Sequence, residues 1–238
     1  MKKVIIFLFF VLLFFTACNN STVDNDFDNF ILLEPKIERE EILSNSDRIE
    51  ELKSKIKKHK EAIDRTVQAT GDLGIVYKLL AIEYMQREMY GPAKEALENA
   101  INIFPENPVL FQMAGVCSAR LAKSKMDPAE RERLFSLSIS YYKRALELDP
   151  RLKDALYGIS VVYIFEKNEP SSAIDYLTKL VSIDPSFIEA RFLLARAYYM
   201  MRNMDASVDQ YMYIIKNSKN KDEVEKAKEN LNIITNNK

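Results

Sequence analysis

The chain is poor in the residue types on which most enzyme and metal sites depend. Its 238 residues include no tryptophan, one histidine, two cysteines and five glycines. Nucleophilic catalysis needs a serine or cysteine beside a histidine base, and metal sites usually need clustered histidines or cysteines. His59 lies in a lysine-rich stretch, which is typical of a surface residue, and the scattered glycines cannot form a phosphate-cradling loop. We therefore expect no catalytic residue, no metal site, no cofactor and no enzymatic activity.

Charge and cysteine content argue against a nucleic-acid-binding protein and against a fold held by disulfides. The 34 basic residues almost balance the 35 acidic ones, so the chain lacks the basic excess of a nucleic-acid-binding protein. The only cysteines are Cys18 and Cys117. If Cys18 is modified, no disulfide within the mature chain is possible, whatever the redox conditions.

Long apolar runs are confined to the N-terminus. After the basic Lys2-Lys3, residues 4–15 are all apolar. A run of this length is too short for a transmembrane helix, which needs about 20 residues, and fits the hydrophobic region of a secretion signal. The signal peptide is predicted to cover residues 1–17. The polar residues that follow it cannot form a core, so we expect a flexible tether over residues 18–37.

The end of the signal resembles a bacterial lipobox. The stretch Phe15-Thr16-Ala17-Cys18 has the small residue and the cysteine of that motif, although Phe15 stands where a leucine is usual. The resemblance implies cleavage before Cys18 and attachment of fatty acyl chains such as palmitate, which would anchor the protein to a membrane. The alternative is an ordinary signal peptide in which the cysteine is coincidental. Either way we expect export to the bacterial cell envelope, on the periplasmic side or facing the exterior.

The middle of the chain repeats itself. Three segments close at Pro105, Pro150 and Pro185, which are 45 and 35 residues apart. Within the segments apolar residues recur every three and four positions, which predicts amphipathic helices. Periods of this length indicate stacked units that share a core only with their neighbours. Such scaffolds bind other molecules far more often than they transform them.

The first unit shows the pattern most clearly. Ala81, Ala93 and Ala100 occupy small positions where two antiparallel helices can approach to about 8–10 Å. Together with Pro105 this arrangement resembles the tetratricopeptide repeat (TPR). The resemblance implies an all-α, right-handed TPR-like α-solenoid of about four helix pairs. We expect an N-terminal helix at 38–70, repeats at 74–107, 108–152, 153–187 and 188–220, and a C-terminal capping helix at 221–238.

Two units are longer than the 34-residue first unit. The second carries 11 extra residues, and the start signal Asp127-Pro128 predicts that its second helix is extended backwards to about residue 128. The third carries one extra residue, which we place in the turn near Glu169-Pro170.

The helix that precedes the repeats has two possible partners. We expect it to run from about Ser46 to Ala69, and Ile49, Ile56 and Ile63 fall seven residues apart, as in a coiled-coil seam. His59 interrupts the seam, and short isolated coils are marginally stable. We therefore expect this helix to pack against the first repeat of a monomer, with a coiled-coil dimer as the alternative.

The TPR resemblance also implies a concave groove lined by the first helix of each repeat. The residues at those positions predict an apolar and aromatic groove with Arg120 and Arg196 as polar anchors. Aromatic, methionine and arginine side chains are the types enriched at binding hot spots. The residues expected to contact a partner are Met85, Arg120, Tyr157, Val161, Phe165, Phe192, Arg196 and Tyr199. Two alternatives stay open: an open site, or a groove covered by the capping helix or by the apolar patch Phe30-Ile31-Leu32-Leu33.

These features predict a membrane-anchored, non-catalytic TPR lipoprotein that acts as a scaffold or adaptor. The expected partner is an envelope protein or peptide bound in the groove, and the membrane is reached through lipidated Cys18. The alternative is an accessory protein that binds a hydrophobic small molecule in association with transport.

Overall fold

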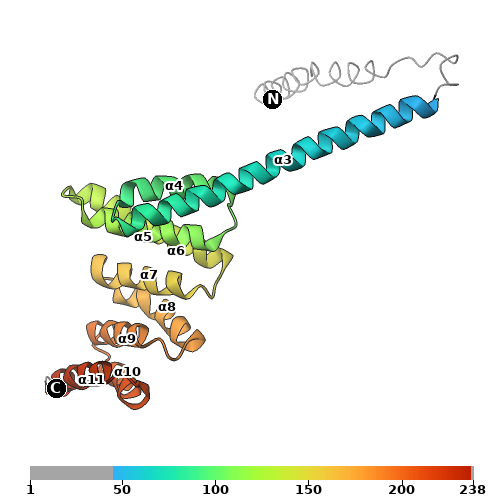
Figure 1. Ribbon diagram of the computed structural model, residues 1–238. Helices are drawn as coiled ribbons and strands as arrows, with labels where there is room; N and C mark the ends of the chain where they lie inside the picture. Colours follow the sequence, from blue (N-terminus) through green and yellow to red (C-terminus); the bar gives the residue numbers. More distant parts are fainter. Residues whose placement is uncertain (1–44, 237–238) are drawn as a thin grey trace, which may run out of the picture. The chain divides into compact units, whose positions relative to one another are not determined.

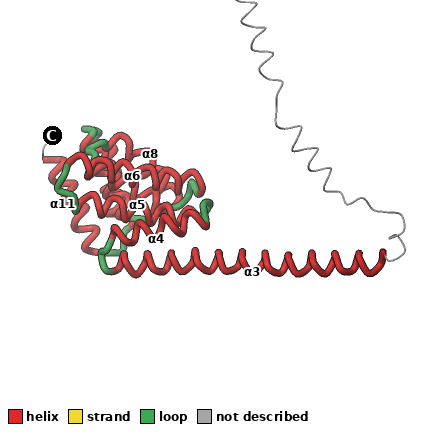
Figure 2. Tube along the Cα trace, turned by 90° about the horizontal axis from the view of Figure 1, so that it is seen from above, coloured by secondary structure: helices red, strands yellow, loops and turns green. Residues whose placement is uncertain are grey.

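The structure is entirely helical over the residues that it describes. The computed structural model describes residues 45–236 and side-chain exposure from residue 48. The predicted signal peptide, Cys18, the tether and the patch Phe30–Leu33 therefore lie outside the described residues. Between residues 45 and 236 helices are joined by short loops and no strand occurs (Figure 2). None of the helices in that range is both long enough and apolar enough to cross a membrane.

Contacts divide the chain into two compact units, Met1–Ala62 and Ile63–Lys238. The described part of the first unit is the opening stretch of helix α3 (Asn45–Gln86), which continues into the second unit. The second unit contains the repeats and the C-terminal helix, stacked in chain order (Figure 1).

The predicted boundary between the N-terminal helix and the first repeat is absent, because α3 runs without a break through Gly71 and Gly74. Gly74 is buried, and a Cβ added there would lie 2.4 Å from a ring carbon of Phe104. The glycine therefore permits close packing rather than ending a helix. The expected packing of residues 63–70 against the first repeat is wrong, since Ile63 and Val67 are 61% and 66% exposed.

The second unit is built from helix pairs, as the repeat pattern predicts. The end of α3 pairs with α4, α5 with α6, α7 and the π-helix η2 with α8, and α9 with α10, while α11 follows as the last helix. The remaining helices are α4 (Tyr90–Ile103), α5 (Pro108–Lys123), α6 (Pro128–Leu148), α7 (Lys153–Val161), η2 (Val162–Glu166), α8 (Pro170–Ile183), α9 (Ile188–Met200), α10 (Met204–Asn217) and α11 (Lys221–Asn236).

Small residues lie at the helix crossings. Ala81, Ala93 and Ala100 have no exposed surface, which fits their predicted role in close helix approach. In the second pair, the buried Ser138 hydroxyl donates to the Gly115 carbonyl at 2.7 Å. In the fourth pair, Ser207 donates to the Ala195 carbonyl at 2.9 Å. These bonds satisfy hydroxyl groups that would otherwise be buried without a partner.

Tyr142 of α6 joins the second and third pairs. Its side chain is only 3% exposed and belongs to the largest hydrophobic core. Two glycines face its ring: a Cβ would lie 3.0 Å from a ring carbon if added to Gly115 of α5, and 2.6 Å if added to Gly158 of α7. The ring thus occupies space that side chains on both neighbouring helices would otherwise take.

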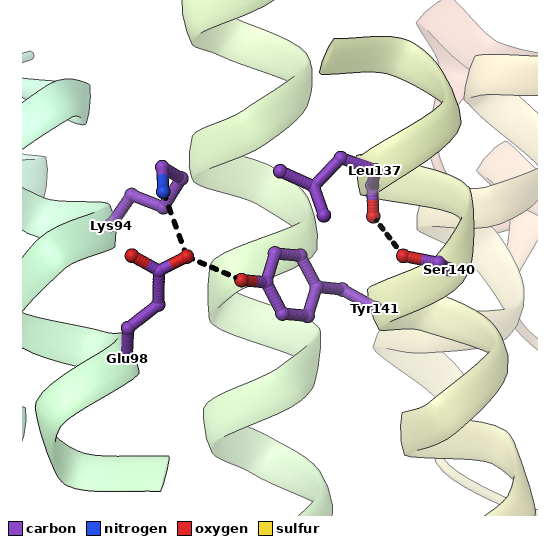
Figure 3. A network of polar contacts seen from close by, with 5 residues as sticks. All are labelled: Lys94, Glu98, Leu137, Ser140 and Tyr141. Carbon is purple, nitrogen blue, oxygen red and sulfur yellow. Dashed lines mark hydrogen bonds and ion pairs between the residues drawn. The ribbon is translucent and has the colours of Figure 1, made fainter. Parts of the chain in front are cut away.

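Hydrogen bonds between partly buried side chains join the first helix pair to the second (Figure 3). Glu98 of α4 accepts hydrogen bonds from Lys94 Nζ at 2.8 Å and from the Tyr141 hydroxyl of α6 at 2.6 Å. Burial raises the pKa of Glu98, but the hydrogen bonds from Lys94 and Tyr141, together with the charge of Lys94, outweigh burial and leave that pKa below its ordinary value. The carboxylate therefore stays ionised and ties the first repeat to the second.

The two length anomalies have different structural causes. The predicted extension of the second helix of the second unit is confirmed: α6 begins at Pro128, with Asp127 accepting from the backbone nitrogens of Ala129 and Glu130. The prediction for the third unit is wrong. Its extra residue lies in η2, where Lys167 N donates to Val162 O at 3.1 Å across a widened turn.

Candidate functional site

A pocket of about 660 Å³ lies between the third repeat, the fourth repeat and the last helix. One wall comes from α7 and η2 through Tyr157 and Phe165, and the floor comes from α9. Helix α11 supplies the opposite wall through Lys226, Asn230 and Ile233. The volume lies in the range of sites for small ligands or for a few side chains of a peptide, about 300–1,000 Å³.

The lining is dominated by aromatic rings that remain accessible to a ligand. Phe165 is 49% exposed and Tyr199 is 40% exposed. Phe192 packs edge-on against Tyr211, with ring centroids 6.0 Å apart. Tyr157 packs on Phe187 at 5.3 Å, which holds its ring at the edge of the pocket. Part of the aromatic surface is thus anchored by the core, while the rest is open to a ligand.

Two cations lie directly over the pocket rings. The Arg196 guanidinium carbon is 4.6 Å from the centre of the Phe165 ring, and Lys226 Nζ is 5.7 Å from the centre of the Phe192 ring. Cation–π contacts of this kind orient the cations and contribute about 0.5–1 kcal/mol at exposed sites. Glu189 is the acidic residue among the lining side chains. The pocket therefore offers apolar surface with charges of both signs.

Two tyrosines of the pocket lining, Tyr157 and Tyr211, have a raised pKa and are therefore neutral. Burial raises the pKa of Tyr157, and the charge of Glu189 raises it further. Burial also raises the pKa of Tyr211, and the charge of Arg196 offsets only part of that change. At neutral pH both phenols consequently keep their protons and can donate hydrogen bonds.

The structure brings together five of the eight residues predicted to contact a partner. Tyr157, Phe165, Phe192, Arg196 and Tyr199 all line the pocket. The other three lie elsewhere, because they belong to earlier repeats or face the core.

Met85 packs against the core that the first repeat shares with α5, and Val161 packs against the largest core. Arg120 is exposed on α5. Contact of any of the eight with a partner stays a prediction.

The predictions from sequence left open that the capping helix covers the groove, but they named none of the α11 residues that line the pocket. The helix was expected to cover the last apolar face, and Ala227 and Ile234 do so. A second stripe of Lys226, Asn230 and Ile233, spaced by four and three residues, lines the pocket. That spacing was visible in the sequence, but its mixed polarity gave no signal of a shared face.

The described residues contain neither a metal-binding cluster nor a reactive thiol. Between residues 45 and 236 there is no group of three or more histidine, cysteine or acidic side chains placed to hold a metal. The Cys117 thiol is fully buried, and burial raises its pKa to about 12. A thiol with that pKa is not a nucleophile at neutral pH.

Comparison with known proteins agrees with this architecture. No family model matches the chain. A "TPR repeat-containing protein" of Borreliella burgdorferi is 25% identical over 204 residues, which cover 86% of this chain and 87% of the relative. The crystal structure of a thermophilic TPR protein of Thermus thermophilus superposes with a TM-score of 0.56 at 18% identity, covering 70% of this chain and 85% of the other.

The fold is a TPR solenoid. A second solved structure, YrrB, described as a TPR protein with an unusual peptide-binding site, gives a TM-score of 0.54 at 20% identity. The superposition covers 75% of this chain and 88% of YrrB. The helix pairs α3–α4 to α9–α10 are thus the repeats of a TPR solenoid, and the pocket lies where the last two of them meet α11.

Proposed function

We propose that the chain is a lipid-anchored, non-catalytic TPR scaffold of the bacterial cell envelope that holds a peptide segment of a partner protein. The observation that carries the proposal is the accessible aromatic pocket between α7, α9 and α11. Aromatic and arginine side chains are the types in which binding energy concentrates. A peptide with apolar side chains and one carboxylate matches the rings and the cations Arg196 and Lys226.

Removal of two pocket rings tests this proposal. In Tyr157→Ala/Phe192→Ala we expect the affinity for the partner to fall at least tenfold, because each hot-spot ring contributes about 2 kcal/mol or more. The partner is first crosslinked to the lipidated protein in native membranes and identified by mass spectrometry. It is then purified, and its Kd is measured with both forms of the scaffold.

Two further variants separate loss of binding from loss of folding. Phe165→Ala/Arg196→Gln alters more exposed side chains, and it should weaken binding while leaving the unfolding midpoint within a few degrees. Met126→Ala/Met212→Ala removes exposed apolar side chains outside the pocket lining and should leave the Kd unchanged. If the Kd of all three variants equals that of the unmodified protein, the pocket is excluded as the partner site.

The anchor has its own test. Replacing Cys18 by serine removes the thiol that would carry the acyl chains, so we expect the protein to move from the membrane fraction to the soluble fraction of the envelope. Several acyl chains bind a bilayer almost irreversibly, since each buried CH₂ contributes about 0.8 kcal/mol. Unchanged membrane association after Cys18→Ser would refute lipid anchoring at this residue.

The size of the pocket also supports a second candidate, an accessory protein for a hydrophobic small molecule associated with transport. About 660 Å³ is enough to enclose such a ligand. This candidate predicts that an apolar compound is released when the mildly purified protein is denatured in organic solvent. Release of such a compound, without any protein partner at the pocket, would favour this candidate over the scaffold.

A further inference from the structure

The first turns of α3 carry an apolar stripe that no described residue covers. Ile49, Leu52 and Ile56 are 48%, 49% and 55% exposed. Side chains three and four positions apart share one face of a helix, so the three form a continuous surface, named here the α3 stripe. All three lie in the first unit of the chain. An exposed apolar stripe with regular spacing is typical of a docking surface.

Basic side chains border the stripe on both sides. By helical position, Arg48 and Lys55 flank one edge, and Lys53 and Lys60 flank the other. Residues 48–60 contain six lysines and arginines against two glutamates. Lys53 pairs with Glu50 at 2.8 Å, and Lys55 pairs with Glu51, but exposed pairs of this kind contribute little. The surroundings of the stripe are therefore strongly positive.

These charges disfavour a second copy of the chain as the occupant. With Ile49 and Ile56 at a and Leu52 at d of a heptad, the flanking e and g positions are Arg48, Lys53 and Lys55. In a parallel pair they would face one another as like charges, and an antiparallel pair would bring the same charges together. Like charges at these positions oppose pairing, so the occupant must bring carboxylates as well as apolar side chains.

A segment with that chemistry immediately precedes α3. Residues 26–43 carry six acidic residues against two basic ones, the opposite of residues 48–60. They also carry eight large apolar residues, namely Phe27, Phe30, Ile31, Leu32, Leu33, Ile37, Ile42 and Leu43. The segment ends two residues before α3 begins at Asn45, so a reversal of the chain at that point brings it alongside the stripe.

We propose that residues 26–43 dock on the α3 stripe of the same molecule. A tethered segment is present at an effective concentration on the order of millimolar, so it outcompetes a free partner of similar affinity at micromolar concentration. Its carboxylates meet the lysines at the edges, and its apolar side chains cover Ile49, Leu52 and Ile56. The tether behind Cys18 is then shortened to residues 18–25. The pocket between α7, α9 and α11 is not involved, so this proposal stands or falls independently of the proposed function.

The experiment is a charge swap read by hydrogen exchange and mass spectrometry at low salt. The parent is the chain from residue 18 with Cys18→Ser, which contains every described residue. Glu38→Lys/Glu40→Lys/Glu41→Lys reverses the segment, Lys53→Glu/Lys55→Glu/Lys60→Glu reverses the edges, and a third protein combines both sets. We expect amides of residues 48–60 to exchange about tenfold faster in each single set than in the parent, because docking blocks opening of the helix.

The combined protein decides between docking and local helix propensity. Docking predicts that it recovers most of the protection, because the opposite charges are again paired, and that salt weakens the protection in both proteins. Equal exchange in the parent and the segment-reversed protein would overturn the proposal. Protection that rises with protein concentration would assign the stripe to a second copy, and protection seen only with phosphatidylglycerol vesicles would assign it to a membrane surface; either result also overturns it.

Discussion

Replacing Tyr142 by alanine will lower the free energy of unfolding by about 3–5 kcal/mol, the range for deletion of a buried aromatic ring. The ring is 3% exposed and lies between Gly115 of α5 and Gly158 of α7. Neither glycine has a side chain that could move into the space left behind. The cavity will therefore persist and separate the second repeat from the third.

Urea denaturation followed by circular dichroism measures this loss. The matched control is Tyr142→Phe, which keeps the ring and removes a hydroxyl that makes no hydrogen bond with another described residue. It should cost less than about 1 kcal/mol. A loss below about 1 kcal/mol for Tyr142→Ala would show that the repeats do not depend on this ring.

Adding a methyl group at Gly158 should destabilise the fold by about 1–3 kcal/mol, as overpacking of a filled core does. The new Cβ would lie 2.6 Å from two ring carbons of Tyr142, and the buried ring has no room to retreat. Alanine is the better helix former by about 1 kcal/mol, so the observed loss is what remains after that gain. Thermal and urea unfolding of Gly158→Ala both report it.

Gly91→Ala is the control for this substitution. Nothing lies within 4 Å of a Cβ at Gly91, which also lies on a helix, so its stability should be unchanged or slightly higher. Gly158→Ala and Tyr142→Ala should also be non-additive, since removal of the ring makes room for the methyl group. A stabilised Gly158→Ala protein, or strict additivity of the pair, would contradict the packing described here.

The helix pairs were predictable because their signals are local. Small residues at 81, 93 and 100 mark crossings, and prolines at 105, 150 and 185 end units, so the periodicity alone predicts the repeats. The start of α6 was predictable for the same reason: Asp127 caps the helix within three residues of its own position. First-helix positions also predicted the rings on the α7 and α9 sides of the pocket.

The features that were missed depend on contacts distant in sequence. Helix α3 continues past Gly74, where the missing side chain leaves room for the Phe104 ring, and nothing near residue 74 in the sequence reports that contact. The π-helix η2 takes up the extra residue within residues 162–166, where no glycine or proline marks the widened turn in the sequence. The wall from α11 depends on how the last helix packs on α10, which its own periodicity does not determine.

The position of α11 links occupancy of the pocket to fraying of the chain end. Terminal helices of a solenoid open first, because they have a neighbour on one side only. Since α11 carries Lys226, Asn230 and Ile233, the pocket exists only while that helix is closed. A ligand at a hundredfold excess over its Kd would hold it closed by about 2.7 kcal/mol. By the same linkage, a change that loosens the last turns weakens binding in proportion to the fall in the closed fraction of α11, and a protease that removes the helix would abolish it.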